Sequence, residues 1–72
     1  MSAEESKEVF IYNVRQRREA EGISISELAR RSGVPLTMLE ELERGVLPKS
    51  MMVDDAWRLS KVFGCELAEL FR

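Results

Sequence analysis

Four glycines divide the chain into short segments, and each segment repeats its apolar residues at the spacing of an α-helix. Gly22, Gly33, Gly45 and Gly64 each stand close to the end of one apolar repeat. Helices often stop at such a residue, because glycine adopts the left-handed conformation there without steric cost. No segment alternates apolar and polar residues as a half-buried strand does. The pattern predicts an all-α fold built from short helices.

Local signals indicate where these helices begin. Ser24 is expected to cap the second helix, with its hydroxyl accepting from the third helical N–H and Glu27 reaching back to the serine N–H. Pro35 suits the opening turn of the third helix, where its missing N–H costs nothing. Asp54 and Asp55 favour the positive N-terminal end of the fourth. The five expected helices cover residues 9–20, 25–32, 35–44, 53–63 and 67–71.

Length and residue types exclude most enzyme chemistry. A chain of 72 residues holds one small core and no large catalytic cavity. It has no histidine and one cysteine, which excludes an internal disulfide, a zinc site with Cys/His spacing and histidine-based acid–base catalysis. We therefore expect a protein that is not an enzyme and that binds no metal and no cofactor.

The net charge of −2 is unevenly distributed. Residues 1–8 carry all of it, so we expect a disordered acidic leader over residues 1–8 and a neutral folding domain over residues 9–72. No apolar run approaches the ~18 residues of a membrane-spanning helix, and the start of the chain lacks the basic and apolar regions of a signal peptide. These features predict a soluble, cytoplasmic protein without a membrane contact.

The segments on either side of Gly33 have the spacing of a helix-turn-helix. Such a unit needs a small residue where its helices cross, a glycine that permits the turn, and apolar residues that fix the second helix. Ala29, Gly33, Val34 and Leu39 meet these needs. With its angle fixed, the helix over residues 35–44 can project into a DNA major groove about 12 Å wide.

Longer stretches carry a family resemblance. They are Val14-Arg15-Gln16-Arg17-Arg18-Glu19, Gly22-Ile23-Ser24-Ile25-Ser26-Glu27-Leu28-Ala29, Glu43-Arg44-Gly45, Ala56-Trp57-Arg58-Leu59 and Phe63-Gly64-Cys65-Glu66-Leu67-Ala68-Glu69-Leu70-Phe71. Over about residues 10–71 the chain resembles the Cro/repressor-type helix-turn-helix family of bacterial and phage regulators, also called the xenobiotic-response-element-like family. The resemblance implies a five-helix, lambda-repressor-like domain that binds double-stranded DNA, usually as a homodimer on a pseudo-palindromic operator. It predicts a sequence-specific transcriptional regulator whose helix 35–44 reads the major groove.

The resemblance also assigns residues to the DNA-binding site. It implies an ion pair between Arg18 and Glu43, which would tie the first helix to the end of the third. Other basic residues are candidates for phosphate contacts, which position a protein without reading its base sequence. Groove-facing apolar and acidic side chains can meet a thymine methyl or accept from cytosine N4. The expected DNA-binding residues are Arg15, Arg17, Ile25, Leu36, Thr37, Met38, Glu40, Glu41, Arg44 and Lys49.

A second hypothesis competes with DNA binding. From Gly33 to Glu43 the chain has three acidic residues and no basic one, which disfavours contact with phosphates. Apolar residues occur where a reader of DNA is usually polar, and methionines form adaptable protein-binding surfaces. The alternative is a non-catalytic protein-interaction module on a helix-turn-helix scaffold that has lost DNA binding. Its partner protein would bind at Leu36, Met38, Glu40, Glu41, Met51 and Met52.

Four further residues have ordinary structural interpretations. Trp57 is expected in the core, because it follows the apolar repeat of the fourth helix, and its alternative role is a platform for a ligand. Cys65 is expected to be a small buried hydrophobe and not a redox sensor. Arg30 and Arg31 stabilise the negative end of the second helix, and their alternative role is to bind phosphate.

Overall fold

The computed structural model describes residues 3–72, which form helices and no strand. The helices are α1 (Ala3–Glu21), α2 (Ile25–Ser32), α3 (Leu36–Glu43), α4 (Val53–Phe63) and the 3-10 helix η1 (Leu67–Phe71). The prediction of an all-α fold is confirmed, but the fifth expected helix is this short 3-10 helix. None of the helices in the described residues combines the length and apolar character needed to cross a lipid bilayer.

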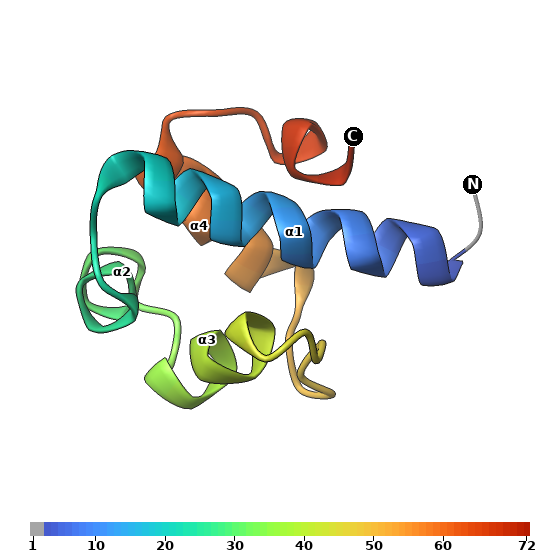
Figure 1. The fold of residues 1–72 in the computed structure, drawn as a ribbon, viewed down its shortest axis with the longest axis horizontal. Helices are drawn as coiled ribbons and strands as arrows, with labels where there is room; N and C mark the ends of the chain where they lie inside the picture. Colours follow the sequence, from blue (N-terminus) through green and yellow to red (C-terminus); the bar gives the residue numbers. More distant parts are fainter. Residues whose placement is uncertain (1–2) are drawn as a thin grey trace.

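The first helix, α1, runs along the length of the molecule, with η1 on one side of it and α2 and α3 on the other (Figure 1). It begins at Ala3, whereas the apolar repeat predicts a start at Val9. Residues 3–8 therefore continue the helix where a disordered leader is expected, and residues 1 and 2 lie outside the described part. The apolar repeat marks only where α1 meets the core, and acidic side chains suit the first turns of a helix.

The core lies where the four α-helices and η1 meet. Each helix contributes the apolar residues of one face, and Val34 in the turn after α2 is buried with them. The buried side chains that fill it are Phe10, Ile11, Val14, Leu28, Val34, Leu39, Leu42, Ala56, Leu59, Phe63 and Leu70.

Trp57 does not belong to this core, so the expectation for it is wrong. The residue is 50% exposed, and the ammonium nitrogen of Lys61 lies 5.0 Å from the centroid of its ring. Helix α4 instead buries Ala56 and, one turn later, the small polar residue Ser60, whose hydroxyl donates to the Trp57 carbonyl at 2.6 Å. Ser60, whose hydroxyl has this hydrogen-bond partner, therefore completes the buried face of α4. The indole of Trp57 lies on the outer side of the helix.

Cys65 is half-buried and packs against the core beside α4. Burial raises the pKa of its thiol, which keeps it protonated and unreactive at neutral pH.

Candidate nucleic-acid interface

Helices α2 and α3 form the predicted helix-turn-helix. The Ser24 hydroxyl caps α2 by accepting from the Glu27 N–H at 3.0 Å. Gly33 ends α2 with φ 79°, and its N–H donates to the Ala29 carbonyl at 2.9 Å. Pro35 directly precedes α3 as its N-terminal cap, one residue outside the position predicted for it. The turn therefore depends on the glycine, whose left-handed backbone other residues rarely adopt.

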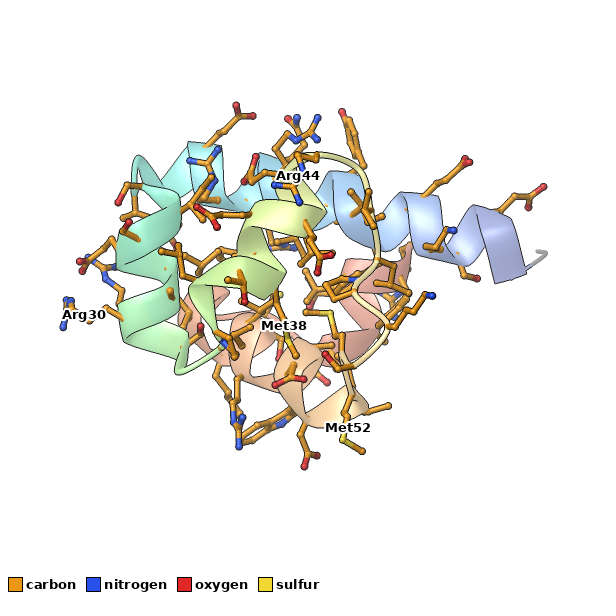
Figure 2. All side chains as sticks on the ribbon, turned by 90° about the horizontal axis from the view of Figure 1, so that it is seen from below. Arg30, Met38, Arg44 and Met52 are labelled. Carbon is orange, nitrogen blue, oxygen red and sulfur yellow. The ribbon has the colours of Figure 1, made fainter. Side chains whose placement is uncertain are left out.

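The outer side of α3 presents Leu36, Thr37, Glu40 and Arg44, all of them exposed. We call these four residues the α3 face. Leu36, Glu40 and Arg44 are four residues apart, which places them along one line of a helix. Figure 2 views the molecule with α3 toward the reader, with Arg44 at the end of the helix. Arg44 is the only cation of this face.

Other positions expected to contact DNA are less available. Glu41 is half-buried beside the α3 face. Met38 and Ile25 are partly buried and pack against the core. Ile25 follows the cap of α2, and its apolar side chain turns inward where a polar residue would remain in solvent. Four residues expected to contact DNA therefore share the α3 face. Two others, Met38 and Ile25, lie mainly against the core and not on this face.

Two arginines of α1 converge on Glu43 at the end of α3. The Arg18 Nε lies 2.6 Å from Glu43 Oε1, and the Arg15 Nε lies 3.4 Å from Glu43 Oε2. Arg18 also donates through Nη1 to the Ile23 carbonyl at 2.8 Å, and Arg15 donates through Nη2 to the Glu43 carbonyl. The expected pair between Arg18 and Glu43 is present, with side chains 16% and 18% exposed. Arg15 was expected to contact a phosphate, but it instead joins Arg18 at the Glu43 carboxylate.

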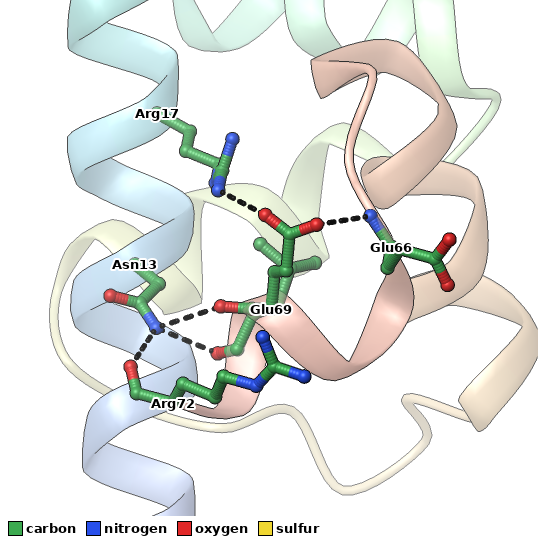
Figure 3. A network of polar contacts seen from close by, with 6 residues as sticks. Asn13, Arg17, Glu66, Glu69 and Arg72 are labelled. Carbon is green, nitrogen blue, oxygen red and sulfur yellow. Dashed lines mark hydrogen bonds and ion pairs between the residues drawn. The ribbon is translucent and has the colours of Figure 1, made fainter.

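Arg17 belongs to a different network, on the side of α1 that faces η1 (Figure 3). Its Nη2 lies 3.2 Å from Glu69 Oε2, and Glu69 Oε1 accepts from the Glu66 N–H at 3.2 Å. Nearby, Asn13 Nδ2 donates to the Leu70 and Arg72 carbonyls, at 3.0 Å each. Because η1 and α3 lie on opposite sides of α1, Arg17 helps to hold the C-terminal turn and is not placed beside the α3 face.

The two arginines at the end of α2 share one carboxylate. Arg30 Nε donates to Glu27 Oε1 at 3.0 Å, and Arg31 Nε donates to Glu27 Oε2 at 2.8 Å. The hydrogen bonds from Arg30 and then Arg31 lower the pKa of Glu27 to about 2. Glu27 therefore does not reach back to Ser24 as predicted, because its carboxylate is occupied. Figure 2 shows Arg30 directed away from α3.

This lowered pKa gives a testable pH dependence. Since the pKa of Glu27 in the folded chain, about 2, lies below its ordinary value of 4.5, the contribution of these pairs to stability is present above about pH 4.5 and is lost as the pH falls toward 2. An NMR titration of the Glu27 carboxyl should have its midpoint near 2, and Arg30→Ala should move it toward 4.5. Arg44→Ala, a control distant from Glu27, should leave it unchanged. A wild-type midpoint near 4.5 would contradict the hydrogen-bonded geometry.

Two of the basic residues expected at DNA phosphates lie beyond the end of α3. Arg44 and Lys49 are both exposed, and neither forms a side-chain ion pair within residues 3–72. Of the four basic residues expected at phosphates, these two are therefore free to act there. The ion pairs of Arg15 and Arg17 join residues far apart in the chain, so no local pattern indicates them.

An apolar depression of about 210 Å³ lies beside the loop between α3 and α4. Met51 and Met52 line it, as expected for a protein-binding surface, but Leu36 and Met38 do not. Met52 and Val53 are 69% and 71% exposed at its rim. Leu47 joins them from the same loop. Three other elements, α1, α4 and η1, contribute Lys7, Phe10, Ala56 and Phe71, which no local pattern in the sequence indicates.

A family model described as "Helix-turn-helix" matches residues 14–70, which include all of α2, α3 and α4. Neither the search of curated proteins nor the search of solved structures returned a match to the chain.

Proposed function

Because the chain belongs to the Cro/repressor-type helix-turn-helix family, we propose that it is a transcriptional regulator that binds duplex DNA with α3 in the major groove. The observation that carries this proposal is the α3 face, which is exposed along its length. It ends in Arg44, and the exposed Lys49 lies in the loop that follows. We further propose that it acts without catalysis, in the cytoplasm, as a homodimer on a pseudo-palindromic site.

The proposed phosphate contacts differ from those expected from sequence. Arg44 and Lys49 supply the positive charge, because Arg15 and Arg17 are held by Glu43 and Glu69. The start of α2 supplies further donors, since the first N–H groups of a helix point outward and attract anions. Ser24 and Ser26 are exposed at that end. In this arrangement two helix ends flank the base-reading surface.

The test is the salt dependence of binding to a labelled duplex, measured by fluorescence anisotropy. Binding should be strongest near ~20 mM salt and should weaken linearly in log–log form, with a slope of about −0.9 for each phosphate contact. Arg44→Gln and Lys49→Gln should each remove about one contact from the slope. Arg17→Gln is the matched control and should keep the wild-type slope. Absence of duplex binding at ~20 mM salt would refute the proposal.

A second candidate function is a non-catalytic protein-interaction module. Two observations favour it: the α3 face has no cation before Arg44, and Met52 and Val53 leave apolar surface exposed beside a depression. A folded chain that fails to bind duplex at low salt would support this candidate. Its expected site is the apolar depression and not α3 alone, because Met51 and Met52 lie there together.

A further inference from the structure

A basic depression of about 380 Å³ lies between the end of α2 and the outer side of α4. No residue of α3 lines it, so the proposed DNA contacts do not use it. Its lining residues are Arg31, Ser32, Trp57, Arg58, Lys61 and Val62. We propose that this depression binds a nucleoside phosphate, with the base stacked on Trp57 and the phosphate held by the surrounding cations.

The aromatic part of the proposal rests on Trp57. Half of the large apolar indole is in contact with water, which is unfavourable unless a ligand covers it. Within the chain, the Lys61 ammonium group forms a cation–π contact with the ring. Trp57 and Lys61 also line a second depression on the other side of α4, toward Gly64 and Glu66. The indole therefore stands between two hollows, where a flat ring can approach it.

The phosphate part rests on the charges around the indole. Arg58 Nη1 lies 3.5 Å from Asp55 Oδ1, at the long end of an ion pair, and Arg58 is half-exposed. Glu27 accepts from the Nε of Arg31, and the terminal nitrogens of Arg31 make no hydrogen bond with any described residue. Lys61 has no acidic partner among those residues. Neither Asp55 nor Glu27 lines the depression, so positive charge predominates inside it.

A nucleoside phosphate is the ligand class that uses both features. Phosphate alone would leave the indole uncovered, and an uncharged aromatic molecule would leave the cations without a counter-charge. Bases stack on exposed aromatic side chains, while arginine and lysine bind the phosphate through charge-assisted hydrogen bonds. The volume is also within the range of small-ligand sites. A free nucleotide and a nucleotide within a single strand share this chemistry.

Trp57 is the only tryptophan of the chain, so its fluorescence reports on the site directly. We would titrate the full chain with AMP, with adenosine and inorganic phosphate as half-ligands, and with a short single-stranded oligonucleotide. AMP should quench the fluorescence saturably, and adenosine should bind about tenfold more weakly because it lacks the charge-assisted contacts. Arg58→Gln and Lys61→Gln should each weaken AMP binding by a similar factor. Arg30→Gln, an exposed α2 residue outside the lining, is the matched control.

The arms of the experiment separate the outcomes. Saturation by AMP supports a free nucleotide, and saturation by the oligonucleotide alone supports a nucleotide within a strand. Absence of saturable quenching by both overturns the proposal, and so does quenching that Arg58→Gln and Lys61→Gln leave unchanged. Circular dichroism of each variant verifies that it is folded. Duplex binding through α3 is measured separately, so the failure of one proposal does not imply the failure of the other.

Discussion

Replacing Glu43 with alanine is expected to lower the free energy of unfolding by about 3 kcal/mol. Among residues 3–72, Glu43 is the carboxylate that both Arg15 and Arg18 face, at 3.4 Å and 2.6 Å. Its removal leaves two guanidinium groups packed beside the core without a counter-charge. Small domains have about 0.05–0.15 kcal/mol of stability per residue, so the loss is a large part of the total.

Urea denaturation of wild type and variants measures this loss. Glu40→Ala is the matched control, because Glu40 lies on the same helix but is exposed, and its free energy of unfolding should change by no more than about 0.5 kcal/mol. Glu43→Gln keeps the shape and a hydrogen-bond acceptor while removing the charge, so its loss should be smaller than that of alanine. A wild-type denaturation midpoint for Glu43→Ala would rule out the ion pair as a tie between α1 and α3.

Replacing Leu70 with alanine is expected to lower the free energy of unfolding by about 3 kcal/mol, although the residue is close to the end of the chain. Its side chain is 0% exposed and packs against the core from η1. Asn13 holds the same turn by donating to the Leu70 carbonyl at 3.0 Å, which limits the collapse of the turn into the cavity left by the leucine.

Leu47→Ala is the control for this substitution. The chemical change is the same, but Leu47 is 37% exposed in the loop after α3, so its loss should be below about 1 kcal/mol. Thermal or urea unfolding of the two variants compares them directly. Equal, small losses would mean that η1 does not pack on the core in solution.

Most helix boundaries follow from the sequence because their causes are local. Gly33 and Gly64 adopt φ 79° and 67°, and α2 and α4 end at the residues just before them, as predicted. The start of α1 is the exception. Its first turns lie outside the core, so no apolar repeat reveals them, and the helix extends to Ala3 without that signal.

Side-chain positions within the helices are predicted less well. Trp57 fits an apolar repeat but is exposed, because the small side chain of Ser60 allows α4 to turn a different face inward. Ile25 resembles a DNA-facing position and yet packs against the core. In both cases the rotation of the helix against its neighbours decides burial, and that rotation depends on residues from several elements.

The all-α class, the ends of the short helices and the helix-turn-helix unit follow from the sequence alone, because capping, glycine turns and apolar periodicity act over a few residues. Which cations remain available to a ligand depends on the packing of the helices. Arg15 meets Glu43 and Arg17 meets Glu69, across separations of 28 and 52 residues, although both arginines were expected at phosphates. A charge is neutralised by whichever opposite charge the fold brings within a few ångströms, and distance along the chain does not predict that partner.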